Sequence, residues 1–131
     1  MRRSVCIASA FAALFLAYGC SARGPILAGE APFVHVVLFK VKAEPKDAAV
    51  AQLVDDIRTV LAPLPTVKGL WVGAPAPTAT RPIVDANYDV GLMLLFEDQQ
   101  GLQAYLDHPA HAEFAKRHDT GNEVRVFDFT R

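Results

Sequence analysis

The chain has 131 residues, with 13 basic and 14 acidic side chains, and 52% of its residues are hydrophobic. This length suits a single domain, and a net charge of −1 lacks the basic excess of nucleic-acid-binding proteins, so we expect no nucleic-acid partner. The two cysteines are too few for a disulfide-rich scaffold or a four-cysteine zinc site.

The first 20 residues have the pattern of a secretory signal peptide. Two arginines follow the initial methionine, and the apolar run from Val5 to Tyr18 is interrupted only by Ser9. This run is short for a membrane span but fits the central region of an export signal. We therefore expect residues 1–20 to direct export to the periplasmic or cell-envelope side.

The end of this leader resembles the bacterial lipoprotein signal. In that signal a small residue precedes a cysteine that is acylated, as Gly19 precedes Cys20 here. A lipid on Cys20 would then be the protein's membrane contact, and residues 21–32, rich in Gly, Ala and Pro, would be the linker. The alternative is a plain export signal cut nearby, with Cys20 incidental.

Residues 33–130 contain no cysteine, so this predicted domain has no thiolate nucleophile.

Residues 33–42 are rich in β-branched and aromatic side chains and predict a first strand. Alternation puts Phe33, His35, Val37 and Phe39 on one face and Val34, Val36 and Leu38 on the other. Since both faces are apolar, we expect this strand to be covered on both sides.

A helix is predicted after Pro45, because apolar residues recur at helical spacing from Val50 to Leu61 and Pro63 ends the pattern. The same spacing puts Asp47, Asp55, Asp56 and Arg58 on the opposite, polar face of the helix.

Two short strands, at 67–72 and 88–96, are predicted on either side of the Pro-rich loop 73–87. A loop of this length can be a dimer-contact arm, a lid over a cleft or a plain surface loop, and the sequence leaves all three open. Asp98 is a predicted helix cap, and Pro109 begins a further helix.

The helix from Pro109 carries His111, Phe114, Ala115 and His118 at matching spacing. We expect His118 at a solvated helix end, where the helix dipole favours it. Gly121 and Asn122 then form a turn, and residues 124–129 are the closing strand.

This order of elements, strand-helix-strand-strand-helix-strand, predicts an α+β fold of the ferredoxin-like type. Such a sandwich has helices on one face of its sheet, so the other apolar face needs cover. A second copy of the chain would supply that cover, and we therefore expect a homodimer.

Several segments in this order resemble the stress-responsive dimeric α/β-barrel family, known as Dabb. They are His35–Lys40, Phe96–Glu97, Leu102–Phe114 and Val126–Phe129, and the Tyr-x-x-His-Pro-x-His pattern at 105–111 is the most specific. The resemblance covers residues 33–130. It implies a ferredoxin-like protomer and a dimeric α/β barrel, and for most members of the family it implies no known reaction.

A plant polyketide cyclase of that family matches this sequence at Tyr105, His108 and His111. The resemblance implies that His111 acts as a general base beside Tyr105, and that His35 lies in the pocket. The cyclase has a further pocket histidine where this chain has Val90, so the same polyketide substrate is not expected.

Two functions therefore stay open. The first is a binding domain for a small apolar or carbonyl-containing ligand, with His35 and His108 as ligand-binding residues. The second is a cofactor-free lyase- or cyclase-like enzyme, in which His111 removes a proton next to a carbonyl group and Tyr105 donates a hydrogen bond. The enzyme requires that Tyr105 and His111 converge on an apolar cavity.

Each of these residues also has a structural interpretation. His108 precedes Pro109 and can cap a helix, His111 can bond to a backbone carbonyl, and Tyr105 and His35 can be core residues. The histidines lack a third ligand at ordinary spacing, so we expect no metal ion, and no motif indicates a cofactor.

Overall fold

The computed structural model describes residues 33–77, 81–119 and 121–130. The predicted leader at 1–20, the linker at 21–32 and Cys20 lie outside these ranges. The elements are β1 (Phe33–Lys40), α1 (Lys46–Asp56), the π-helical segment η1 (Ile57–Leu61), β2 (Gly69–Gly73), β3 (Val90–Phe96), α2 (Gln99–Leu106), α3 (Pro109–His118) and β4 (Glu123–Thr130). None of the helices in these ranges has the length and apolar character needed to cross a membrane.

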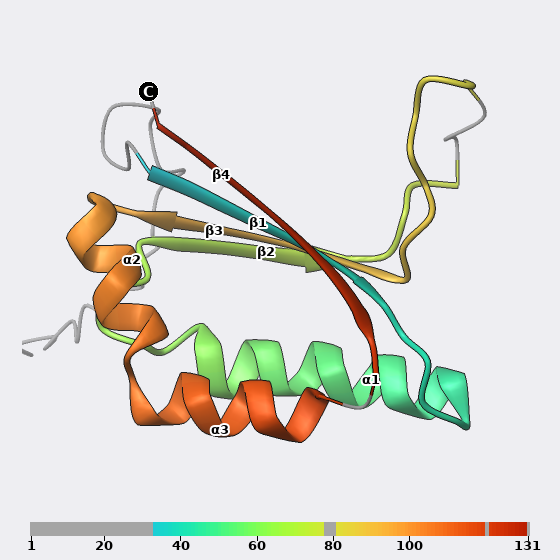
Figure 1. Cartoon of the computed structure of the whole chain (residues 1–131), viewed down its shortest axis with the longest axis horizontal. Coiled ribbons are helices and arrows are strands. Elements are labelled where there is room, and N and C mark those ends of the chain that lie inside the picture. Colours follow the sequence, from blue (N-terminus) through green and yellow to red (C-terminus); the bar gives the residue numbers. More distant parts are fainter. Residues whose placement is uncertain (1–32, 78–80, 120, 131) are drawn as a thin grey trace, which may run out of the picture.

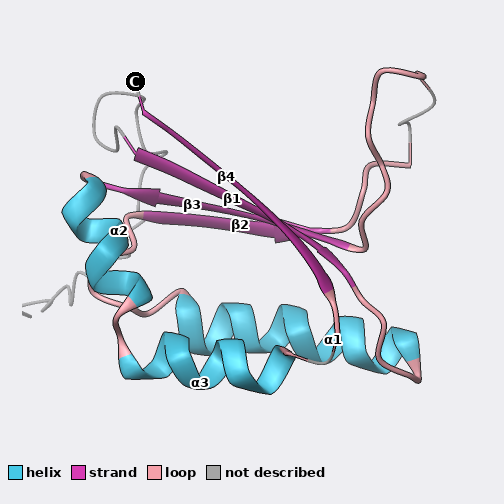
Figure 2. Cartoon of the chain, viewed as in Figure 1, coloured by secondary structure: helices cyan, strands magenta, loops and turns pink. Residues whose placement is uncertain are grey.

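The strands form one antiparallel sheet in the order β2-β3-β1-β4, and the helices cover one face of it (Figures 1 and 2). On that face α3 packs against η1, while α2 lies at one end of the helical layer (Figure 1). This arrangement confirms the predicted ferredoxin-like fold. The predicted helix between Asp98 and Pro109 and the helix that Pro109 begins are α2 and α3.

β1 is a central strand, because it pairs with β3 on one side and with β4 on the other. Its side chains alternate as predicted: those that face the helices are buried, and those on the other face are half-buried. The helix face of β1 therefore forms the floor of the hydrophobic core.

The first strand is two residues shorter than predicted, since side chains bind its last backbone amides. The amide of Val41 donates to the Asp89 carboxylate at 2.8 Å, and that of Lys42 donates to the Asn122 side-chain oxygen at 2.9 Å. These bonds replace the pairing that would have continued the strand.

The break between α2 and α3 is built from two helix caps. Asp98 accepts a hydrogen bond from the Gly101 amide at 2.7 Å, which begins α2 as predicted. The Nδ1 atom of His108 accepts from the Ala110 amide at 3.1 Å, and Pro109 follows as the first residue of α3. The chain therefore turns at His108 and starts a second helix in a new direction.

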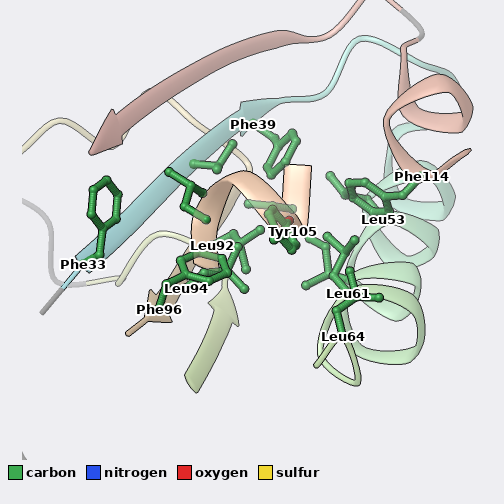
Figure 3. Packing of buried hydrophobic residues seen from close by; sticks show 14 of the residues in the cluster. Phe33, Phe39, Leu53, Leu61, Leu64, Leu92, Leu94, Phe96, Tyr105 and Phe114 are labelled. Carbon is green, nitrogen blue, oxygen red and sulfur yellow. The ribbon is translucent and has the colours of Figure 1, made fainter. Parts of the chain in front are cut away.

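The core lies between the sheet and the helices, and Figure 3 shows Tyr105 among its buried side chains. Leu94 and Phe96 of β3 and Ile57 and Leu61 of η1 are fully buried, and Tyr105 is 2% exposed. Tyr105 thus anchors α2 against the sheet.

The predicted environments of Asp56 and His118 were wrong. Asp56 is not on a solvent-facing surface but is 5% exposed, and its carboxylate accepts hydrogen bonds from Arg117 at 3.1 Å and from His118 at 2.8 Å. The His118 side chain is itself 12% exposed. The reason is the packing of α3 against η1, which brings the basic end of α3 over the end of α1.

The face of the sheet away from the helices carries large exposed apolar side chains. Trp71, Phe127 and Phe129 are each about half exposed, and they share this face with Val36 and Leu38 of β1.

The described parts of the loop between β2 and β3 extend away from the sheet (Figure 1). Arg125 of β4 ties this loop to the sheet, because it pairs with Asp85 and donates to the Asn87 carbonyl.

Candidate active site

A cavity of about 460 Å³ lies between the sheet and the last two helices. β1 and β4 form one wall, and α2 and α3 form the other. Most of its lining is apolar, with Val37, Phe39, Leu92, Phe114, Val124 and Val126 among the contributing side chains. The polar exceptions include Tyr105 and the histidines 35, 111 and 118. This combination, an apolar hollow with a few converging polar groups, is typical of a small-molecule site.

His35 enters the cavity from the sheet, oriented by a carboxylate on the next strand. The β1–β4 register puts His35 directly opposite Asp128, and the His35 Nδ1 atom lies 2.6 Å from the Asp128 Oδ1 atom. A carboxylate oxygen accepts, so Nδ1 donates to it, and among the described residues no hydrogen bond is made by Nε2 of His35. A carboxylate that fixes an imidazole in one tautomer is a recurring part of acid–base sites.

The Tyr105 ring lies near two imidazole rings. Its ring centre is 6.2 Å from that of His35 and 4.6 Å from that of His111. Burial raises the pKa of Tyr105 far above its ordinary value. Its hydroxyl therefore keeps its proton at neutral pH and can donate a hydrogen bond, for example to a carbonyl oxygen.

His111 projects into the cavity from the first turn of α3. Its Nδ1 atom donates to the Leu106 carbonyl at 3.1 Å, so Nε2 of the neutral ring carries a lone pair. Burial lowers the pKa of His111, and the nearby His35 acts in the same direction, while the bond to Leu106 opposes them. The ring is therefore in its basic, unprotonated form at neutral pH.

The structure thus brings three of the four predicted site residues together, namely His35, Tyr105 and His111. The structural interpretation of His111 also holds, since a backbone carbonyl binds its Nδ1 atom, and that bond leaves Nε2 available. His108 instead caps α3 and does not contribute to the cavity lining. In the described ranges no three His, Cys, Asp or Glu side chains gather in a group that could hold a metal ion.

The comparison with family models decides the family. The model of the Dabb family, described as the stress-responsive A/B barrel domain, matches residues 33–131. The chain belongs to the Dabb family. No curated protein sequence matches it.

Solved structures share the fold of this Dabb domain. A Dabb protein from Mesorhizobium loti with a ferredoxin-like fold is 20% identical, with a TM-score of 0.63 over 77% of this chain and 97% of that chain. A dimeric ferredoxin-like protein of unknown function from Thermobifida fusca is 20% identical, with a TM-score of 0.62 over 77% and 92%. The hydroxynitrile lyase from Passiflora edulis is 16% identical, with a TM-score of 0.66 over 78% and 94%. At these identities the likeness shows the fold alone.

Sequence reasoning missed the roles of two residues in this Dabb domain: Asp128, which holds the cavity residue His35, and His118, which lines the cavity itself. Asp128 was not considered, although a signal exists: it is the acidic residue within the apolar end of the last strand, and antiparallel pairing with the first strand puts it opposite His35. His118 was assigned to a solvated helix end, because its partner Asp56 lies 62 residues away on another helix.

We predict that His111 titrates below its ordinary pKa of about 6.5. The unfolded chain then takes up a proton at a higher pH than the folded chain does, so this group makes the free energy of unfolding fall as the pH drops below about 6.5. Ring-proton chemical shifts measured by NMR against pH test the titration. A His111 ring that is half protonated at or above pH 6.5 would contradict it.

Proposed function

We propose that this Dabb domain binds a small, mainly apolar carbonyl compound in the cavity and removes a proton from the carbon next to the carbonyl group. One observation carries the proposal. The Nδ1–H of His111 is held by the Leu106 carbonyl, so its basic Nε2 atom is left without a hydrogen bond among the described residues, in a cavity that His111 shares with the protonated Tyr105.

In the proposed step, Nε2 of His111 takes a proton from the α-carbon, and the electrons of the broken C–H bond form an enolate. The negative charge of the enolate collects on its oxygen, and the Tyr105 hydroxyl stabilises it by donating a hydrogen bond. The imidazolium then returns a proton to the carbon. The cycle needs no oxidant, metal ion or cofactor, and His35, held by Asp128, binds the ligand beside Tyr105.

The apolar walls support the choice of ligand. Val37 and Phe39 of β1 lie opposite Val126 and Val124 of β4, so the sheet side of the cavity is a continuous apolar surface beyond His35. Such a surface favours an aliphatic or aromatic body over a strongly polar one. The hydroxynitrile lyase with the same fold supports catalysis without assigning a reaction to this chain.

We also propose a homodimer formed through the face of the sheet away from the helices, which we call the open face. Trp71, Phe127 and Phe129 expose a large apolar area on that face, which is costly for a monomer in water. Structures of similar fold are described as dimeric ferredoxin-like proteins, which supports a second copy as the cover.

For the residues before Phe33 we propose export with a lipid anchor. The apolar leader at 1–20 and Cys20 after Gly19 support an acylated N-terminus, with residues 21–32 as the linker to the domain. The protein would then be held at the periplasmic or cell-envelope side.

The exchange of α-protons with solvent tests the catalytic proposal. In heavy water, the protein should speed deuterium uptake into methyl heptyl ketone, measured by proton NMR, and His111→Ala should slow it by roughly a hundredfold to ten-thousandfold. Gln103→Ala, an exposed truncation on α2, is the control and should keep the full rate. A wild-type rate in His111→Ala would remove His111 as the base.

A charge in the open face tests the dimer. Phe127→Glu should give a monomer in analytical ultracentrifugation at micromolar concentration, because a carboxylate would be buried against the second copy. Ala51→Glu adds the same charge on the exposed side of α1 and should leave the dimer intact. A wild-type protein that sediments as a monomer contradicts the proposal.

Replacing Cys20 tests whether a lipid on this residue anchors the protein to the membrane. Cys20→Ser should move the protein from the membrane fraction to the soluble fraction of the cell envelope, since no acyl chain can then be attached. Cys6→Ser, inside the leader, should change nothing. If the wild-type protein is already soluble after export, Cys20 is not an anchor.

A further inference from the structure

The cavity has a second polar end that the proposed reaction does not use. His118 lines the same cavity as His111, seven residues later on α3. Seven residues are about two helical turns, so both rings lie on the same side of the helix and about 10 Å apart along its axis. Phe114 and Ala115 lie between them and also line the cavity. The lining along α3 is therefore apolar between two imidazoles, those of His111 and His118.

A buried carboxylate holds the His118 ring in place. The Nε2 atom of His118 lies 2.8 Å from the Asp56 Oδ2 atom, and Arg117 donates to the same oxygen at 3.1 Å. Gln52 donates to the other carboxylate oxygen, Oδ1, at 3.3 Å. Burial acts against ionisation of Asp56, but the bonds from His118 and Arg117 outweigh it and hold the pKa of Asp56 below its ordinary value. Asp56 is thus an ionised acceptor, and Nε2 of His118 carries the hydrogen.

The remaining nitrogen of the ring is therefore the one that a ligand can use. Within the described residues, the ring hydrogen bond of His118 is made by Nε2, and Nδ1 is left with a lone pair when the ring is neutral. The Phe114 ring packs against His118 with the ring centres 4.7 Å apart, which restricts its rotation. A lone pair in this position accepts a hydrogen bond from a hydroxyl group.

The charges around His118 favour a hydroxyl over an anion. Lys116 and Asp119 line this end of the cavity, and Arg117 pairs with Asp56 behind the ring. These two cations and two anions cancel, so the side chains around the His118 ring have no net positive charge that would select a carboxylate or a phosphate. Asp119 would also repel an anionic group directly.

We infer that the ligand of this cavity is an elongated, mainly apolar carbonyl compound with a hydroxyl group about 10 Å from its carbonyl, bound by the Nδ1 atom of His118. This inference rests on the proposed function, which puts the carbonyl group at Tyr105 and His111. His118 is then a specificity-determining residue, and Asp56 is a positioning residue that acts through it.

Affinities measured by calorimetry on the purified protein test whether His118 binds a hydroxyl group. The three probes have one chain length: methyl heptyl ketone, its ω-hydroxy derivative and its ω-carboxy derivative. The hydroxy ketone should bind up to about tenfold more tightly than the parent ketone, which corresponds to one hydrogen bond. In His118→Phe this advantage should vanish, because the nitrogen that accepts the hydroxyl is removed. Asp56→Asn should reduce the advantage, because the ring is then held less firmly.

A second measurement does not depend on the folding of any variant. In the wild-type protein, the ω-hydroxy derivative of the shorter methyl butyl ketone should bind no better than its parent, because its hydroxyl cannot reach His118. Each of three results would overturn the inference. The hydroxy and parent forms of methyl heptyl ketone could bind with equal affinity, the advantage of the hydroxy form could survive in His118→Phe, or the ω-carboxy form could bind most tightly. Absence of α-proton exchange would instead overturn the proposed reaction and leave these affinities as they are.

Discussion

The pairing of β1 with both β3 and β4 is the constraint on which the rest of this structure depends. Because side chains alternate along a strand, this register decides which face each residue of the sheet joins. It puts His35 next to Asp128 on the helix side, and it puts Phe127 on the open side. A shift of one residue would move His35 out of the cavity and its apolar neighbours out of the core.

The second constraint is the break between α2 and α3. His108 caps α3 and Pro109 is its first residue, so the chain changes direction between Tyr105 and His111. Both rings consequently face the same cavity, although six positions in one continuous helix would place them on different sides. The Leu106 carbonyl, at the end of α2, then fixes the His111 ring. The residues that end one helix and start the next therefore also determine the chemistry of the site.

Local patterns in the sequence were sufficient to predict most of the fold. The alternation in the first strand, the caps at Asp98 and His108, and the strand and helix order were all confirmed, because each depends on neighbouring residues. The exact end of the first strand was not predicted, since it depends on side chains of Asp89 and Asn122 that are distant in sequence.

The candidate site was predictable only in part, for the same reason. Tyr105 and His111 stand out in one short motif, whereas Asp128 and Asp56 acquire their roles from contacts across 93 and 62 residues. Helical spacing predicted Asp56 on the polar face of its helix, but the residue is buried. The spacing within one helix could not show that the end of α3 covers that position and makes an ion pair there.

The proposed reaction requires the carbonyl group of the ligand to lie beside the side chains of Tyr105 and His111. A crystal structure of the protein with methyl heptyl ketone tests this most directly. We predict the ketone oxygen within hydrogen-bond distance of the Tyr105 hydroxyl, with an α-carbon beside the Nε2 atom of His111. A ketone bound on the open face of the sheet, or one in the cavity with its oxygen turned away from Tyr105, would contradict it.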